Sequence, residues 1–271
     1  MAFPKFSCLC CTFLRPKQLA NAVACFEALD YPLDRRELIA LDDVGQYPDE
    51  PSGPGWQIVS IPRRFQTLGE KRNALAGLAS SNTDAFVVWD DDDAYLPWTL
   101  SAHASVLSEG KEWSAPSVVF NENQASPRLT YHKAKNLFHA AWAFSRDAFR
   151  AVHGYPWKNS GEDQALGGRL ARSGVKAGDP TELWPPYFIH RWVTSGSWHL
   201  SAHGSSGYDR LAERIASDSA SVSDWSPRLS EEWGEIALSH LRDKLATDCD
   251  DAQQLWSSQR QDVFAGLQLK A

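Results

Sequence analysis

The chain has 271 residues, of which 43% are hydrophobic and 23% charged, a balance typical of a globular protein. Its formal net charge of -7 argues against a nucleic-acid polymer as partner, because binding a polyphosphate requires a basic surface. No apolar run is long enough to cross a bilayer, so we expect no transmembrane segment. The five cysteines are odd in number and lack the paired spacing of a zinc site, so reduced thiols and a cytoplasmic location are expected.

Strand and helix patterns alternate up to about residue 95, as is typical of a parallel sheet with crossover helices. Strands are expected at residues 6–12, 37–41, 56–61 and 85–89, and helices at residues 16–29 and 67–79. Thr67 and Glu70 have the spacing of a capping box at the start of the second helix. Three strands end in polar residues, namely Thr12, the pair Asp42-Asp43 and residues 90–93. Because parallel strands end at one edge of a sheet, we expect these residues to meet there, where such folds bind ligands.

Beyond residue 97 the order of the elements changes. We expect a helix at residues 97–109, a hairpin from 117–121 and 128–132, a strand at 140–144, short helices at 145–152 and 162–172, and loop and strand at 179–192. The chain after residue 216 is acidic, helical in pattern and poor in β-formers. The expected organisation is therefore one domain at 1–215 and a C-terminal helical extension at 216–271.

Four consecutive aspartates, residues 90–93, directly follow the apolar strand and repel one another. A hard divalent cation, Mg²⁺ or Mn²⁺, that bridges to a phosphate-bearing substrate is the simplest neutraliser, and a solvated acidic turn is the alternative. Lys71 and Arg72 lie in the first turn of the preceding helix, where cations beside free N–H groups form an anion pocket. The basic pair Lys71-Arg72 therefore favours a bound metal and phosphate over a solvated acidic turn.

Three further features have both a structural and a functional interpretation. Glu162-Asp163 at a helix start either caps the helix or supplies a base for an incoming nucleophile. His190, His199 and His203 lie within fourteen residues of one another. Either one of them completes a metal shell, with His190 as the candidate, or all three are structural. Most of the twelve tryptophans belong to the core by default, and a few, with Trp142 as a candidate, offer an apolar platform for a sugar ring.

Taken in order, these motifs resemble those of family 2 glycosyltransferases, inverting nucleotide-sugar enzymes with a GT-A fold. The matching segments, between about residues 5 and 200, are Thr12 to Arg15 on the first strand, the pair Asp42-Asp43, Arg72-Asn73 at the helix start, the run 90–93 with Pro97 as a DxD region, and Glu162-Asp163 as an acceptor motif. Two departures are that Gly45 does not directly follow the acidic pair, and that four aspartates leave the metal ligand open. Counting back from Pro97 favours Asp91 and Asp92, with Asp90 or Asp93 in support.

The resemblance implies an α/β fold, GT-A (Rossmann-like), with a mostly parallel sheet flanked by helices. It implies a nucleoside-diphosphate sugar as donor, UDP-linked by preference, and a glycan or small molecule as acceptor. The implied roles are donor binding by Thr12, Arg15, Asp42, Asp43, Arg72 and Asp91, binding of Mn²⁺ or Mg²⁺ by Asp91 and Asp92 with His190 as the further candidate, acceptor contacts by Glu162 and Trp142, and base catalysis by Asp163. The Gly/Ser/His-rich segment 194–207 is the expected loop that closes over the donor.

Two other functions remain open. A nucleotidyltransferase on a similar sheet would use the same metal but attack the α-phosphate; a glycine-rich basic loop after the first strand would favour it, and residues 11–17 contain no glycine. The other alternative is a catalytically silent nucleotide- or sugar-binding module that keeps the fold. It would bind a donor without turnover.

Overall fold

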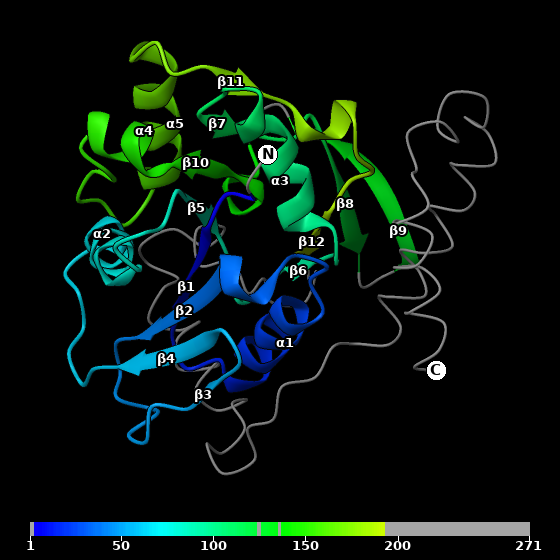
Figure 1. Cartoon of the computed structure of the whole chain (residues 1–271). Coiled ribbons are helices and arrows are strands. Elements are labelled where there is room, and N and C mark those ends of the chain that lie inside the picture. Colours follow the sequence, from blue (N-terminus) through cyan, green and yellow to red (C-terminus); the bar gives the residue numbers. More distant parts are fainter. Residues whose placement is uncertain (1–2, 124–125, 135–136, 193–271) are drawn as a thin grey trace. The chain divides into compact units, whose positions relative to one another are not determined.

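The computed structural model describes residues 3–123, 126–134 and 137–192 (Figure 1). The α-helices are α1 (Pro16–Glu27), α2 (Leu68–Leu78), α3 (Thr99–Ser108), α4 (Arg146–Ala151) and α5 (Glu162–Arg172), and the short 3-10 helices are η1 (Leu33–Arg35), η2 (His139–Ala141) and η3 (Pro180–Glu182). The expected closing loop at 194–207 and the helical extension at 216–271 lie outside the described residues.

One sheet of eight strands forms the centre of the fold (Figure 1). Its order is β11 (Ala177–Gly178), β7 (Trp113–Ser114), β10 (Ala143–Ser145), β5 (Ala85–Val88), β1 (Phe6–Thr12), β2 (Arg36–Asp42), β4 (Trp56–Ser60) and β3 (Ser52–Gly53). β1 pairs in parallel with β2 and β5, and β2 pairs in parallel with β4, whereas β10 is antiparallel to β5. Thr12 lies opposite Asp42 in the register, so the polar strand ends meet at one edge, as expected.

A second sheet of four strands begins directly after the aspartate run. Its order is β6 (Ala94–Tyr95), β12 (Phe188–Trp192), β8 (Val118–Asn123) and β9 (Ser126–Lys133). β6 pairs antiparallel with β12, which fixes the chain on the far side of the aspartates. The run is therefore held between the end of a central strand and the start of another sheet.

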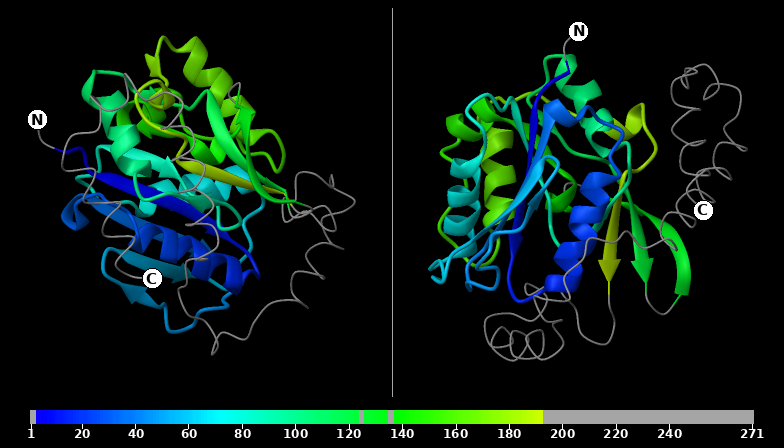
Figure 2. Two further views of the ribbon diagram at one scale, coloured as in Figure 1. Left: turned by 90° about the vertical axis from the view of Figure 1, so that its right-hand side faces the viewer. Right: turned by 60° about the horizontal axis from the view of Figure 1, so that its bottom comes forward.

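Helices cover both faces of the large sheet. Leu9 and Cys11 of β1 share one core cluster with Leu75 of α2 and with Leu166 and Leu170 of α5. Figure 2 (right) shows α2, α4 and α5 on this face and α1 on the other. All seven residues of β1 are buried, as expected for a strand of a parallel sheet covered on both faces.

The expected elements agree with the structure except at the start of the strand expected at 140–144 and at several two-residue strands. The residues expected to open a strand at 140 form the end of η2 instead, and β10 begins only at Ala143. The imidazole of His139 contacts the Tyr155 hydroxyl at 2.8 Å and so fixes the turn, which a short apolar run does not reveal. The strands β3, β6, β7 and β11 have two residues each and are too short to give a pattern.

The expectations of reduced thiols and of no transmembrane segment can be compared with the described residues. Cys8, Cys10, Cys11 and Cys25 are free and buried thiols, and Cys249 lies outside the described residues. In the described part of the chain, every helix is too short or too polar for a bilayer crossing.

Candidate active site

The end of β1 is tied to the aspartate run by a hydroxyl and a guanidinium group. Thr12 donates a hydrogen bond from Oγ1 to Asp91 Oδ2 over 2.7 Å. Arg15 follows β1 and approaches Asp91 Oδ1 to 2.6 Å through Nη2 and Asp92 Oδ2 to 2.7 Å through Nη1. The side chains of Arg15, Asp91 and Asp92 are largely buried, so the charges of the two carboxylates are partly offset by Arg15.

Lys71 of α2 links the ends of β1 and β2. Its ammonium donates to the Thr12 carbonyl oxygen over 2.5 Å and to Asp43 Oδ1 over 2.7 Å. Arg64 Nη1 also donates to Asp43 Oδ1, over 2.9 Å, while its guanidinium lies 3.8 Å from the centre of the Phe13 ring. Asp43 therefore sits between two cations at the edge of the site.

Asp42 organises the loop that follows β2. Its carboxylate accepts hydrogen bonds from the backbone N–H groups of Val44 and Gln46 and from the Ser60 hydroxyl, at 3.2, 2.7 and 2.8 Å. These contacts are typical of an aspartate that shapes a turn. A donor contact by Asp42 stays a prediction.

Three members of the aspartate run gather into a group suited to a divalent cation. Asp90, Asp92 and Asp93 each offer one carboxylate oxygen, and these oxygens all lie within 4.8 Å of one another. Hard carboxylate oxygens are the ligands that Mg²⁺ and Mn²⁺ prefer, so the donor set fits these metals. Two backbone N–H groups help to hold it: that of Arg191 donates to Asp93 Oδ1 over 3.0 Å, and that of Asp90 donates to the Tyr95 hydroxyl over 2.7 Å.

Asp91 is not a member of this carboxylate group. The sequence favoured Asp91 and Asp92 as the principal ligands, with Asp90 or Asp93 in support. The structure brings Asp90 and Asp93 together with Asp92, while Asp91 contacts Thr12 and Arg15. Burial and the neighbouring Asp92 carboxylate raise the pKa of Asp91, and Arg15 opposes this effect. A metal contact by Asp91 stays a prediction.

Arg72 of α2 connects the carboxylate group to α5. Its Nη1 and Nη2 each lie 3.3 Å from Asp90 Oδ1, and its Nε lies 3.5 Å from Glu162 Oε1. Burial, the largest single effect, lowers the pKa of Arg72, but Asp90 together with Cys11, Tyr155 and Glu162 raises it well above its ordinary value, so the guanidinium stays charged. The expected cation beside the aspartate run is thus present, and it faces carboxylates on two different elements.

The Glu162-Asp163 pair opens α5, as the sequence predicts. Gly161 precedes it with φ 70°, a left-handed conformation that glycine adopts readily. Glu162 is buried, and this burial raises the pKa of its carboxyl group, whereas Arg72 lowers it. Asp163 is half-buried, and its Oδ1 accepts from the Gln164 N–H over 2.7 Å.

Two other predicted site residues are not members of the carboxylate group. His190 Nδ1 lies 3.0 Å from Asn121 Oδ1, and within the described ranges His190 does not belong to the mutually close acidic group. Trp142 is buried in the core against Trp113, and a Cβ on Gly167 of α5 would meet its indole ring. His199 and His203 lie outside the described residues. A metal contact by His190 and an acceptor contact by Trp142 remain predictions.

Two residues of the site, Tyr95 and Arg64, are not among the predicted site residues. Tyr95 stacks on Trp89 with ring centres 3.7 Å apart and accepts the Asp90 N–H. Its place two residues after the aspartates was a usable signal. Arg64 reaches Asp43 from a loop, and no sequence pattern distinguishes it from its neighbour Arg63.

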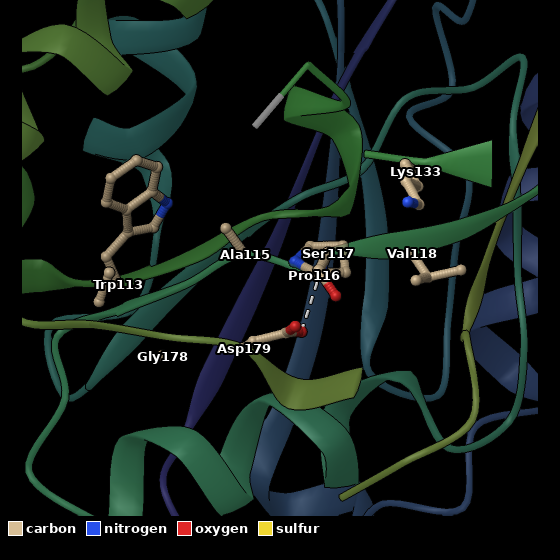
Figure 3. Close-up of a pocket in the computed structure, with 9 residues that line it drawn as sticks. Trp113, Ala115, Pro116, Ser117, Val118, Lys133, Gly178 and Asp179 are labelled. Atoms are coloured by element: carbon tan, nitrogen blue, oxygen red, sulfur yellow. Dashed lines mark hydrogen bonds between the residues drawn. The ribbon is translucent and has the colours of Figure 1, made fainter. Parts of the chain in front are cut away.

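A separate cavity of about 460 Å³ lies at the carboxyl ends of β7 and β11 (Figure 3). The residues that line it are Trp113, Ala115, Pro116, Ser117, Val118, Lys133, Ala177, Gly178 and Asp179. The Ser117 N–H donates to Asp179 Oδ1 over 3.1 Å and closes one side. None of the predicted site residues lines this cavity, so it is distinct from the carboxylate group.

No protein-family model and no curated protein sequence matches the chain. Solved structures do. The 1–349 fragment of S. aureus TarS in complex with UDP is 14% identical, with a TM-score of 0.54, over 79% of this chain and 72% of that one. Mannosyltransferase PcManGT from Pyrobaculum calidifontis, in complex with GDP-Man and Mn²⁺, is 13% identical, with a TM-score of 0.52, over 100% of this chain and 87% of that one.

Other TarS matches cover less of the relative. The chain covers 60% of another structure of the 1–349 fragment, at 14% identity and a TM-score of 0.53, and 36% of a longer TarS chain. Identities this low establish the fold alone. The fold that the sequence resemblance implied is thereby confirmed: the chain has the mixed, mostly parallel α/β fold of the GT-A glycosyltransferases.

Proposed function

We propose that the chain is a metal-dependent inverting glycosyltransferase that moves a sugar from a nucleoside-diphosphate sugar, UDP-linked by preference, to an acceptor hydroxyl. The observation that carries this proposal is the group of Asp90, Asp92 and Asp93 at the carboxyl edge of a GT-A sheet. Structures of the same fold with UDP, with UDP-GlcNAc, and with GDP-Man and Mn²⁺ support the donor class.

The donor diphosphate would lie between the carboxylate group and the two guanidinium groups that border it. Asp92, with Asp90 and Asp93, would hold Mn²⁺ or Mg²⁺, which stabilises the negative charge that develops on the leaving diphosphate. Arg15 and Arg72 would bind the phosphate oxygens, since guanidinium groups pair well with phosphates.

The remaining donor residues would orient these groups and the nucleoside. Thr12 and Asp91 fix the position of Arg15, and Asp43 with Lys71 ties the strand ends together. Asp42 shapes the neighbouring loop. These contacts hold the edge of the site in place before a donor binds, which favours catalysis by a preorganised site.

Asp163 would act as the base in a single displacement. The acceptor oxygen attacks the anomeric carbon from the face opposite the diphosphate, the bond from that carbon to the diphosphate oxygen breaks, and Asp163 takes the hydroxyl proton. What supports this role is the position of Asp163 at the start of α5, next to Glu162, which contacts Arg72 beside the carboxylate group. Trp142 packs behind the same helix and would support it from the core.

Product analysis separates this function from its alternatives. The protein is incubated with UDP-glucose, UDP-GlcNAc or GDP-mannose, Mn²⁺ and a panel of methyl glycosides, with pyrophosphate added to half of the samples. Glycosyl transfer gives a nucleoside diphosphate and a product of inverted anomeric configuration, which ³¹P and ¹H NMR detect.

A nucleotidyltransferase would instead give a sugar 1-phosphate and a nucleoside triphosphate, only in the samples with pyrophosphate. A silent module would bind donor and leave it intact. Either result would contradict the proposed transfer.

A further inference from the structure

The two arginines beside the carboxylate group differ in how closely they pair. Arg15 lies 2.6 and 2.7 Å from its two carboxylate partners, which is typical of a charge-assisted hydrogen bond. Arg72 keeps 3.3 Å from Asp90 and 3.5 Å from Glu162. Among the described residues, its Nε has no hydrogen-bond partner although it is buried. The guanidinium of Arg72 therefore donates two long hydrogen bonds to Asp90, each of 3.3 Å, while its Nε faces Glu162 without hydrogen-bonding it, so Arg72 pairs with both carboxylates.

The surroundings of Arg72 strengthen its attraction to both carboxylates. The side chains of Arg72 and Glu162 are only 11% and 7% exposed, so water screens their attraction poorly. The Tyr155 ring lies 5.8 Å from the guanidinium carbon on one side. The contact partners of Arg72 also belong to different elements, since Asp90 follows β5 and Glu162 opens α5.

We infer that Glu162 is a positioning residue for the metal site: it holds Arg72 back from Asp90 and so keeps the Asp90 carboxylate available to a divalent cation. Without the negative charge on Glu162, Arg72 would close on Asp90 and compete with the metal for its oxygens. This inference rests on the proposed function, because it takes Asp90 as a metal ligand. It also couples α5, which carries the proposed base, to the metal.

Mn²⁺ affinity in the absence of nucleotide tests the inference directly. Free Mn²⁺ is measured by electron paramagnetic resonance while the metal is titrated into the wild-type protein and into Glu162→Gln. We expect Glu162→Gln to weaken Mn²⁺ binding by about tenfold or more, as is usual when a residue that orients a metal ligand is lost. Glu162→Asp keeps the charge and should retain more of the affinity.

Asp163→Asn is the matched control. It removes one negative charge from the same helix turn, but the described contacts of Asp163 do not include Arg72. If charge alone mattered, both amide variants would weaken Mn²⁺ binding alike. We instead expect Asp163→Asn to change the Mn²⁺ affinity by less than about twofold, because only Glu162 holds Arg72. In an Arg72→Gln background, Glu162→Gln should also lose its effect, because there is no cation left to hold back.

The inference is overturned if Glu162→Gln binds Mn²⁺ like the wild type, if Asp163→Asn matches its effect, or if the effect persists in the Arg72→Gln background. A wild-type protein that binds no Mn²⁺ would instead contradict the metal site of the proposed function, and the inference with it. Circular dichroism and thermal unfolding of each variant show whether it is folded.

Discussion

Arg15 is the residue whose charge most directly balances the aspartate run. It pairs with Asp91 and Asp92 at once, and its side chain is 11% exposed. Removing one partner of such a buried pair leaves an uncompensated charge, which typically costs more than the pair itself contributes. Amide variants of these aspartates remove the same charge but keep the shape of the side chain and an oxygen that can accept from Arg15, so they are better probes than alanine variants.

Arg72→Ala should weaken the binding of UDP in the presence of Mn²⁺. Loss of a charged hydrogen bond costs about 1.5–3 kcal/mol, so the dissociation constant should rise by roughly tenfold or more. Calorimetric titration measures it. Arg150→Ala is the control, since Arg150 lies exposed on α4 and its Nη1 is 4.0 Å from Asp147. An equal, small effect of both changes would return Arg72 to a structural role.

Asp163→Asn should reduce glycosyl transfer by roughly two or more orders of magnitude, within the usual range for loss of a general base. The amide keeps the shape of the side chain and its hydrogen bond to the Gln164 N–H, but it cannot take a proton. UDP affinity should stay close to that of the wild type. Near-normal transfer would place the base elsewhere, and a parallel loss of UDP binding would make Asp163 a donor contact.

The first turn of α2 is packed tightly against the loop that precedes α5. Gly69 donates its N–H to the Lys158 carbonyl oxygen over 3.1 Å, and Leu68 donates its own to Asn159 Oδ1 over 3.0 Å. A Cβ on Gly69 would overlap the Pro156 carbonyl oxygen. These contacts tie α2, which carries Arg72, to the loop that leads into α5, which carries Asp163.

Gly69→Ala should lower the free energy of unfolding by about 1–3 kcal/mol, because the added methyl group forces the backbone apart. Gly77→Ala on the same helix is the matched control, since a Cβ there meets nothing within 4 Å. Alanine at that position should stabilise the helix by up to about 1 kcal/mol. Urea unfolding of both variants compares them, and a neutral Gly69→Ala would contradict the close packing.

Helix α3 is joined to β7 by a buried histidine. His103 Nδ1 lies 2.9 Å from Ser114 Oγ, and burial lowers the pKa of His103 to about 3. The unfolded chain takes up a proton near the ordinary histidine pKa of about 6.5, and the folded chain does not. Stability should therefore fall as the pH drops from about 6.5 toward 3, by at most about 1.4 kcal/mol per pH unit from this residue.

Thermal unfolding between pH 7.5 and 5 measures this dependence. The loss of stability should be smaller in His103→Gln, which has no titratable group at this position. An unchanged pH dependence in the variant would mean that other groups cause it.

The sequence predicts the four central strands of the large sheet, whereas the contacts around the aspartate run join residues that lie far apart in the chain. Long apolar segments such as residues 6–12 and the Thr67 cap have local signals, and both agree with the structure. Which of residues 90–93 come together does not follow from spacing, because it depends on contacts with distant elements, such as that of Thr12 with Asp91 and that of the Arg191 N–H with Asp93. Contacts across long separations, such as Arg72 with Glu162, have no local signal at all.

The central claim is that a divalent cation held by the aspartate run binds the donor diphosphate, and calorimetric titration of UDP tests it most directly. With Mn²⁺ present, the wild-type protein should bind UDP strongly, and with EDTA it should bind UDP weakly. Asp92→Asn should remove the difference, because Asp92 belongs to the carboxylate group. Equal UDP affinity of the wild-type protein in Mn²⁺ and in EDTA would contradict the account.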